Sequence, residues 1–286
     1  MFKLALSLIS LYISGTLAGN SDPYTLQTDK SAGERLDKQA QIVEKSAGDV
    51  IDRHIKPGQT VLDIGCANGY TTLNLAKKVG PEGMVYAVDK SPELLEMCRK
   101  RMQQNGIKNV TFIQHDITKP FPEEKFTKKV DFVFMRWILM HLKNPGQTLS
   151  FIKPLLNNGA VIMSHEPVNS RMKVDGTPEG VSTFIDGMLA LGKKNNVDYD
   201  MGESTAGVFR QQEIEVVSID KPEFTIPAEN AKRMLTSITN ELKPKLLEHM
   251  VLSEEDIDLI LRDYRKLEGE YQIPFMTYVT GKFIKE

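Results

Sequence analysis

The stretch VLDIGCANGY, residues 61–70, decides the fold of this chain. It joins a short run of β-branched and apolar residues, Thr60–Ile64, to a turn that Gly65 opens and Gly69 closes. Glycine allows the backbone to turn tightly and to approach a ligand closely. In open parallel sheets, ligands bind beyond the carboxyl ends of the strands, where the strand order reverses. The stretch therefore predicts a strand of a parallel sheet with a binding site at its carboxyl end.

Strands and helices alternate on either side of this turn. Apolar residues at three- and four-residue spacing predict an amphipathic helix over 30–55. Ser91-Pro92-Glu93 reads as an N-cap, a first-turn proline and a first-turn acid, so a helix is expected from there to Asn105-Gly106. The other expected strands are 84–88, 110–114, 130–135 and 160–164, and the other helices are 71–79 and one beginning near Pro145. Such alternation, with strands apolar on both faces, predicts a doubly wound α/β fold with a parallel sheet covered on both sides.

The regular alternation ends after residue 167. The expected elements there are helices over 181–196 and 203–212, a strand over 213–218, two or three helices within 229–268 and a last strand over 275–283. No repeat, low-complexity tract or linker divides the chain. Residues 19–286 are therefore expected to form one domain, with a helical cap mainly from 20–55 and 177–268.

The first eighteen residues differ from the rest. Lys3 is followed by the apolar run LALSLISLYISG and then by Thr16-Leu17-Ala18, which resembles a signal-peptidase site. The run is shorter than the about 20 residues that a membrane-spanning helix needs. Residues 1–18 are expected to be an export signal or, alternatively, an apolar helix that packs on the domain or anchors it at a membrane surface.

Composition excludes several classes of function. The chain has 286 residues, 41% of them hydrophobic and 26% charged, as in ordinary globular domains. Its net charge of −2, without long runs of like charge, argues against a nucleic-acid partner. The one basic cluster, Arg99-Lys100-Arg101, is expected on a solvated helix face. Two cysteines and five singly placed histidines give no metal-ligand spacing, so no metal is expected.

Asp63 distinguishes the glycine turn from a dinucleotide site. A dinucleotide fingerprint reads G-x-G-x-x-G, whereas Gly65-Cys66-Ala67-Asn68-Gly69 lacks the middle glycine. A carboxylate two positions before Gly65 repels a pyrophosphate but suits a ligand that carries an ammonium and a sulfonium. The alternative is that Asp63 only caps the turn that follows. A nucleotide-dependent oxidoreductase is thus the weaker interpretation.

Two further acids end the next two strands. Asp89 closes the second strand, where a carboxylate can accept hydrogen bonds from both hydroxyls of an adenosine ribose. Asp116 follows the third strand, where it can accept from the exocyclic amine of adenine while Ile117 packs on the ring. Singly, Asp89 could start the next helix and Asp116 could be an ordinary loop acid. Acids at three successive strand ends together favour an adenosine-containing ligand.

Four segments together resemble a known family. VLDIGCANGY, AVDKSPELLEMCRKR, FIQHDI and DFVFMRWILMHL resemble the successive motifs of the class I S-adenosylmethionine-dependent methyltransferases. DFVFMRWILMHL is similar to the Arg-x-x-Leu-Met-His-Leu segment of a bacterial, small-molecule-type branch of that family. The resemblance extends motif by motif over about residues 35–167 and only in general layout beyond. It implies a mostly parallel, seven-stranded Rossmann-like sheet and S-adenosyl-L-methionine as cosubstrate.

The resemblance also assigns roles to individual residues. It implies that Asp63 and the turn contact the methionine part, that Asp89 holds the ribose, and that Lys90 lies beside the adenine. Asp116 and Ile117 would bracket the base. The full implied donor site is Asp63, Gly65, Cys66, Ala67, Gly69, Asp89, Lys90, Asp116, Ile117, Met135 and Arg136. Ala67 is a departure, since glycine is commonest at that position.

The segment after the fourth strand bears on the methyl acceptor. Enzymes of this superfamily that methylate nucleobases or glutamine amides carry Asn/Asp-Pro-Pro-Tyr/Phe there, whereas this chain has Met135-Arg136-Trp137-Ile138. We therefore expect a small-molecule acceptor at an oxygen, nitrogen or carbon atom. Trp137 is expected to be a core residue. A proton-accepting base is expected in the pair His165-Glu166, directly after the fifth strand, with His141 as a weaker candidate.

The donor motifs and the first eighteen residues each leave an alternative. A non-catalytic module that only binds S-adenosylmethionine would carry the same donor motifs, so it remains the alternative function. Location is also open, because residues 1–18 favour export or anchoring while a cosubstrate made inside cells favours the cytoplasm.

Overall fold

The computed structural model describes Asp37, Ala40 and residues 50–172, 177–222, 225–272 and 275–285. The expected leader over 1–18 and most of the expected helix over 30–55 lie outside the described residues. Within the described part of the chain, no helix is long and apolar enough to cross a membrane.

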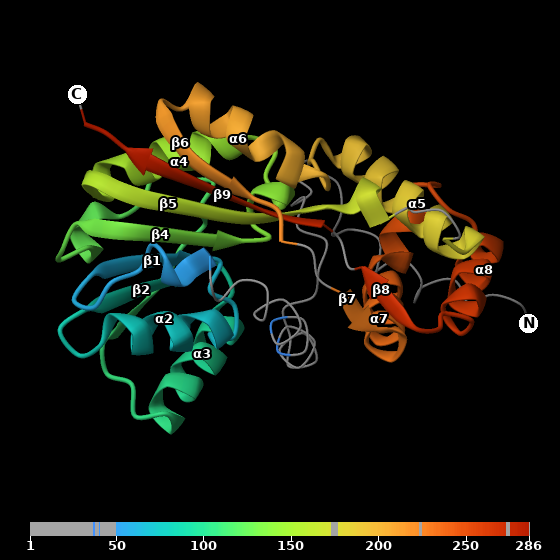
Figure 1. Ribbon diagram of the computed structural model, residues 1–286, viewed down its shortest axis with the longest axis horizontal. Helices are drawn as coiled ribbons and strands as arrows, with labels where there is room; N and C mark the ends of the chain where they lie inside the picture. The colour runs from blue at the N-terminus through green and yellow to red at the C-terminus, as the bar shows by residue number, and fades with distance from the viewer. Residues whose placement is uncertain are drawn as a thin grey trace, which may run out of the picture.

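A seven-stranded sheet forms the centre of the molecule, in the order β3-β2-β1-β4-β5-β9-β6 (Figure 1). Its strands are β1 (Thr60–Ile64), β2 (Met84–Asp89), β3 (Val110–Gln114), β4 (Val130–Arg136), β5 (Leu156–Val168), β6 (Ile214–Asp220) and β9 (Phe275–Phe283). The first five strands run parallel, and β9 is antiparallel to both of its neighbours, β5 and β6. The predicted doubly wound, mostly parallel fold is confirmed. The strand order reverses between β1 and β4, so a ligand site is expected beyond their carboxyl ends.

Helices cover both faces of the sheet. The helices of this layer are α2 (Tyr70–Val79), α3 (Pro92–Gln104), α4 (Pro145–Ile152) and α6 (Met201–Gln211). Figure 1 shows α2 and α3 on one side of the sheet and α4 and α6 on the other. Leu75 of α2 packs with Phe134 of β4 in one core, and Leu149 of α4 packs with Val133 in the core of the opposite face. The two cores explain why the strands are apolar on both faces.

Local sequence accounts for where these helices begin. The Ser91 hydroxyl accepts a hydrogen bond from the Leu94 backbone N–H at 3.2 Å, with Pro92 in the first turn of α3. Asn144 caps α4 in the same way, through the Gln147 backbone N–H at 3.1 Å. These caps satisfy backbone donors that have no partner inside the helix.

A second group of elements lies beyond the sheet. It consists of α5 (Glu179–Asn195), α7 (Ala228–Glu248), α8 (Glu254–Tyr264) and the two short antiparallel strands β7 (Thr225–Pro227) and β8 (Glu270–Gln272). Figure 1 shows these helices on the side toward which the carboxyl ends of β4 and β5 point. Their buried faces join the core through Phe184, Leu235 and Ile260. The helices expected over 181–196 and within 229–268 are present here, whereas the helix expected over 203–212 is α6, which lies against the sheet. That this group of helices caps the ligand site stays a prediction.

Two features differ from the expected elements. The pair β7–β8 was not predicted, because strands of three residues show no alternation. The strand β5 runs to Val168, well past the expected end at 164, because β9 pairs with it from Val161 to Val168. His165 and Glu166 were expected directly after the strand, but both lie within it and are fully buried. Short 3₁₀ turns complete the fold: η1 (Glu123–Lys125), η2 (Leu139–His141), η3 (Lys153–Leu155) and η4 (Asn169–Met172).

Candidate donor and acceptor site

The glycine turn after β1 has a left-handed backbone at three positions. Gly65 has a φ of +70°, Ala67 of +48° and Gly69 of +80°. A Cβ atom on Gly65 would lie 2.0 Å from Cδ1 of Ile138, and one on Gly69 would lie 2.4 Å from Sγ of Cys98. Both glycines are therefore required by close packing as well as by backbone conformation. Ala67 adopts a conformation that favours glycine.

The turn is fixed to the neighbouring strand. The backbone N–H groups of Gly65 and Cys66 donate to the carbonyl oxygen of Val88, at 2.8 and 3.0 Å. The side chain of Cys66 is buried against Leu95 and Cys98 of α3, and this burial raises the pKa of its thiol well above the usual range. The carboxyl ends of β1 and β2 are thus locked together.

Asp63 is buried at the end of β1. Only 3% of it is exposed, and its Oδ2 accepts a hydrogen bond from Oγ1 of Thr72 at 2.7 Å. Burial raises its pKa to about 6, although the Thr72 hydrogen bond and the positive charge of Arg136 act to lower it. Asp63 therefore holds the first turn of α2 and places a titratable carboxyl beside the glycine turn.

Asp89 joins the glycine turn to the start of α3. Its Oδ2 accepts from the Ala67 backbone N–H and its Oδ1 from the Ser91 backbone N–H, both at 2.9 Å. Burial raises its pKa, and the backbone hydrogen bonds partly counter this effect. Each carboxylate oxygen has a second lone pair, so both can still accept a ligand hydroxyl. Lys90 beside it is exposed.

Asp116 lies past the end of β3 and is exposed. Its Oδ1 accepts from the Thr118 backbone N–H at 3.0 Å and from the Thr118 hydroxyl at 2.7 Å. Partial burial acts to raise its pKa, but these hydrogen bonds and the charges of Lys119 and Lys90 lower it below the usual value. Ile117 is half-buried against the core, and its carbonyl accepts from the Thr148 hydroxyl at 3.1 Å.

The three acids end three adjacent strands. Asp63 is the last but one residue of β1, Asp89 is the last residue of β2, and Asp116 lies two residues past the end of β3; these three strands are neighbours in the sheet. The three carboxyl groups therefore lie at the same edge of the sheet. The glycine turn, which has no side chain at Gly65 or Gly69, lies at this edge too. This set of hydrogen-bond acceptors fits S-adenosylmethionine, whose ammonium, two ribose hydroxyls and adenine amine are donors.

The end of β4 presents side chains to both faces of the sheet. Met135 is fully buried in the same core as Ile64, whereas Arg136 is on the Asp63 face, where its charge lowers the pKa values of Asp63 and His165. Trp137 follows with a φ of +55°, and its backbone N–H donates to the carbonyl of His165 at 2.9 Å.

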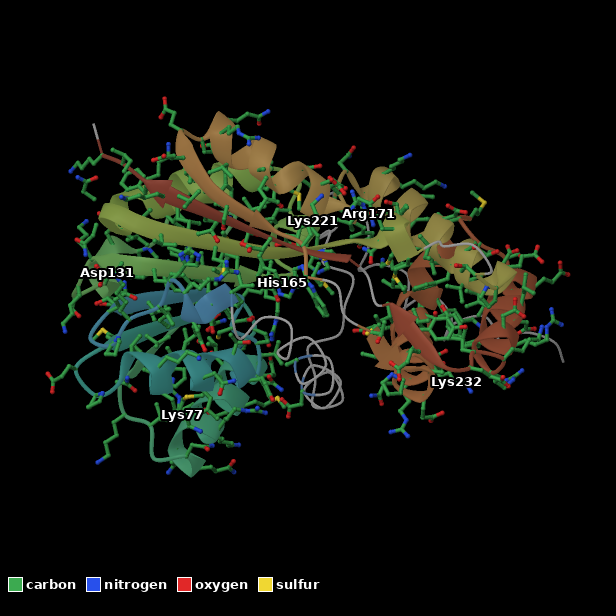
Figure 2. All side chains as sticks on the ribbon, viewed as in Figure 1. Lys77, Asp131, His165, Arg171, Lys221 and Lys232 are labelled. Atoms are coloured by element: carbon green, nitrogen blue, oxygen red, sulfur yellow. The ribbon has the colours of Figure 1, made fainter. Side chains whose placement is uncertain are left out.

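The predicted position of His165 and Glu166, after the fifth strand, is wrong, because both lie within β5. Adjacent strand residues point to opposite faces of a sheet, which separates the two side chains. His165 is fully buried and stacks on Tyr278, with ring centroids 3.9 Å apart, near the carboxyl end of the sheet (Figure 2). Burial and the nearby charge of Arg136 hold its pKa well below the usual value. Among the described residues, neither of its ring nitrogens has a hydrogen-bond partner.

Glu166 contacts the backbone that follows Trp137. Its Oε1 accepts from the N–H groups of Ile138 and Leu139, at 3.0 and 2.9 Å, and its Oε2 from Met140 at 3.4 Å. Burial raises its pKa to about 7 despite these hydrogen bonds. His141 ends the same 3₁₀ turn, with its ring 6.0 Å from that of Tyr199. The catalytic roles of His141, His165 and Glu166 stay predictions.

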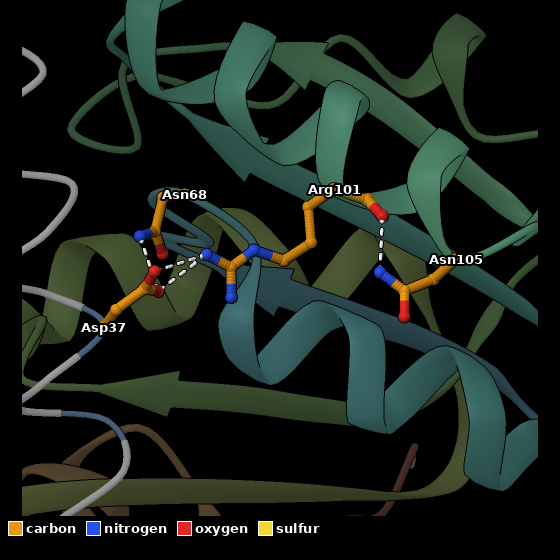
Figure 3. A network of polar contacts seen from close by, with 4 residues as sticks. All are labelled: Asp37, Asn68, Arg101 and Asn105. Atoms are coloured by element: carbon orange, nitrogen blue, oxygen red, sulfur yellow. Dashed lines mark hydrogen bonds and ion pairs between the residues drawn. The ribbon is translucent and has the colours of Figure 1, made fainter.

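A network that the sequence did not suggest ties α3 to the glycine turn (Figure 3). Nη2 of Arg101 lies 2.7 Å from each carboxylate oxygen of Asp37, and Nδ2 of Asn68 donates to Oδ1 of Asp37 at 2.8 Å. The prediction of a solvated face is wrong for Arg101, whose side chain is 22% exposed, against 57% for Arg99. Helical spacing contained the signal, because Arg101 lies one turn after Cys98, which contacts Gly69.

Within the described residues, no group of three or more His, Cys, Asp or Glu side chains is arranged to hold a metal ion.

Comparison with known proteins agrees with this geometry. Residues 55–183 match the sequence profile of a family described as a methyltransferase domain. The chain is 34% identical over 112 residues to a demethylmenaquinone methyltransferase of Symbiobacterium thermophilum, a match that covers 38% of this chain and 43% of that protein. It is 31% identical over 112 residues to an aklanonic acid methyltransferase of a Streptomyces species, covering 39% and 49% of the two chains. The matches thus span less than half of these relatives.

A solved structure extends the likeness to the whole fold. The crystal structure of an S-adenosylmethionine-dependent methyltransferase from Aquifex aeolicus aligns with a TM-score of 0.56 at 16% identity, over 90% of this chain and all of that one. At such identity the likeness concerns the fold alone, while the profile match covers the strands that carry Asp63, Asp89 and Asp116. Residues 55–183 therefore match a methyltransferase domain by sequence, and the chain as a whole shares the fold of an S-adenosylmethionine-dependent methyltransferase.

Proposed function

We propose that this protein transfers a methyl group from S-adenosylmethionine to an oxygen, nitrogen or carbon atom of a small molecule. The observation that carries the proposal is the set of three carboxylates, Asp63, Asp89 and Asp116, at adjacent strand ends around the glycine turn. The relatives named for demethylmenaquinone and aklanonic acid support a small-molecule acceptor.

The residues of the site would act mainly by binding and alignment. The sulfonium of the cosubstrate supplies an already activated methyl group. Asp89 and Asp116 would fix the adenosine, and Asp63 would bind the ammonium at the other end. Holding acceptor, methyl carbon and sulfur in line supplies much of the rate enhancement of such a transfer. The glycine turn and Arg136 would line the site and keep this alignment, while Met135 supports the end of β4 from the core on the other face.

An oxygen or nitrogen acceptor that carries a proton would also need a base to take that proton. His165 is held neutral by burial, which a base requires, yet its ring is fully buried and stacks on that of Tyr278 from the neighbouring strand β9. His141 is also buried, at 9% exposure, but sits in the turn after β4. His141 and His165 therefore remain the histidine candidates for a base.

The test combines donor binding with turnover. S-adenosylhomocysteine titrated into the wild-type protein by calorimetry should bind, and reduced nicotinamide dinucleotide should not. A methyl-labelled donor incubated with the protein and pooled metabolites and lipids should then yield a labelled product by mass spectrometry. Donor binding without any labelled product would favour the non-catalytic binding module, and absence of donor binding would overturn the proposal.

A further inference from the structure

The chain reverses direction sharply after β4 and needs an anchor there. Trp137 has a left-handed backbone, and the 3₁₀ turn η2 begins two residues later at Leu139. A 3₁₀ turn of three residues has few hydrogen bonds of its own, so its first N–H groups need acceptors from elsewhere. The conformation of this segment is therefore set by an outside partner.

Glu166 is that partner. The two shortest of its contacts, from Ile138 and Leu139, converge on the single oxygen Oε1, and the Ser164 hydroxyl lies 3.3 Å from the same atom. The side chain is fully buried, and the carboxylate sits in a concave arrangement of successive N–H groups of the kind that binds anions. Because the Glu166 carboxylate accepts these hydrogen bonds, it holds the backbone of Ile138 and Leu139 in place.

The anchored segment in turn contacts the donor site. Ile138 places its side chain where a side chain on Gly65 would lie, with Cδ1 2.0 Å and Cγ1 2.9 Å from that position. Gly65 itself is fixed from the other side by its hydrogen bond to the Val88 carbonyl. The turn is therefore clamped between β2 and Ile138.

We infer that Glu166 is a positioning residue for the methyl donor, acting through Ile138, and not the proton-accepting base. The carboxylate fixes the N–H groups of Ile138 and Leu139, Ile138 packs on Gly65, and Gly65 opens the turn that meets the methionine part of the donor. This inference rests on the proposed function, since it concerns the site that would bind S-adenosylmethionine.

The decisive variants are Glu166→Gln and Glu166→Leu. Glutamine keeps a carbonyl oxygen that can accept from Ile138 and Leu139, whereas leucine leaves those donors without an acceptor. We expect Glu166→Leu to weaken S-adenosylhomocysteine binding about tenfold or more and Glu166→Gln to stay within about threefold of wild type, measured by calorimetry. Ile138→Ala, which keeps the carboxylate and removes the contact with Gly65, should also weaken binding by about threefold or more.

A matched control separates positioning from loss of stability. Ile162 is fully buried in β5 and lies on the same face as Glu166, two alternations earlier along the strand. Ile162→Ala should lower the melting temperature while leaving S-adenosylhomocysteine affinity within about twofold of wild type, at a temperature where every variant is folded.

The outcomes distinguish the inference from the proposed function. A wild-type protein without affinity for S-adenosylhomocysteine would overturn both. If Glu166→Leu and Ile138→Ala both keep the wild-type affinity, the positioning role alone is overturned. The same holds if Ile162→Ala loses as much affinity for S-adenosylhomocysteine as Glu166→Leu does. If Glu166→Leu does not fold, Ile138→Ala decides, because a half-buried side chain can be shortened without unfolding the domain: weaker binding supports the inference and unchanged binding overturns it.

Discussion

Arg101 and Asp37 form an ion pair in which both carboxylate oxygens lie 2.7 Å from the same guanidinium nitrogen. The pair connects the chain before the first strand to α3, and Asn68 of the glycine turn donates to the same carboxylate. The Arg101 guanidinium also lies 5.5 Å from the ring centroid of Tyr70, at the start of α2. Three segments distant in sequence thus meet beside the glycine turn.

Breaking this pair should loosen the turn. Arg101→Ala is expected to weaken S-adenosylhomocysteine binding about three- to tenfold and to lower the free energy of unfolding by on the order of 1 kcal/mol, since the pair is partly exposed. Arg99→Ala is the matched control, because Arg99 is the more exposed arginine of the same helix and its ion pair, with Glu96, lies within that helix. Hydrogen exchange at residues 68–70 should rise in the first variant and stay unchanged in the second. Equal behaviour of the two variants would contradict the assigned role.

The acids at the strand ends should contribute to the affinity for the methyl donor. Asp63→Ala and Asp89→Ala are each expected to weaken S-adenosylhomocysteine binding more than about tenfold, or roughly 1.4 kcal/mol. Asp131→Ala serves as control, because Asp131 lies near the opposite, amino-terminal end of β4 and accepts from the Thr60 backbone N–H. It should reduce stability without changing affinity. Calorimetry that finds unchanged affinity in both site variants would disprove the site assignment.

Alanine substitutions at two glycines with nearly the same φ can distinguish the cost of backbone strain from the cost of steric clash. Gly58 has a φ of +81°, and a Cβ atom added to it would have nothing within 4 Å, whereas Gly69 has a φ of +80° and its Cβ would meet Cys98 Sγ at 2.4 Å. Gly58→Ala should cost about 1 kcal/mol from backbone strain alone. Gly69→Ala should cost about 2–4 kcal/mol, since overpacking adds to the strain. Chemical denaturation measures both, and similar values for the two would show that Cys98 moves aside freely.

The raised pKa of Glu166, about 7, predicts how stability depends on pH. A carboxyl whose folded pKa lies above its unfolded value of 4.5 binds more protons in the folded state, so stability falls as pH rises between these values. The buried neutral His165 acts in the opposite direction below its usual pKa of 6.5. Comparing the unfolding free energies of wild type and Glu166→Gln isolates the contribution of Glu166 to this pH dependence. Between about pH 4.5 and 7, the wild type should lose stability relative to the variant as pH rises, by up to about 1.4 kcal/mol per pH unit. A constant difference between the two unfolding free energies would contradict the raised pKa.

The N-terminal segment gives a prediction that is independent of the site. If residues 1–18 are an export signal, protein isolated from its native host should begin near Gly19 by N-terminal sequencing. An intact Met1 on soluble protein would exclude cleavage, and an intact Met1 on membrane-bound protein would favour an anchor.

Sequence reasoning was strongest where local chemistry determines structure. Ser91 and Pro92 identify the start of α3, and the three acids mark the ends of three neighbouring strands, because capping and strand ends involve residues close in sequence. The extension of β5 through His165 was not visible, since it depends on pairing with Tyr278 in a strand more than a hundred residues later. The roles of Arg101 and Glu166 could not be predicted for the same reason, since they too depend on partners distant in sequence. Their partners, Asp37 and Ile138, are brought to them by the fold.

The short strands β7 and β8 have a consequence for how such a protein can change over evolutionary time. They pair where the chain leaves for α7 and returns from α8, with Thr225 opposite Gln272, so the excursion begins and ends at neighbouring points. Loops between fixed ends can be lengthened or replaced at small entropic cost, and here this leaves the register of β9 against β5 and β6 untouched. The recognisable family likeness ends at residue 183, before this excursion begins. The pairing of β9 therefore leaves the length of this excursion free to vary, while Leu235 and Ile260 keep its helices packed in the core of the sheet.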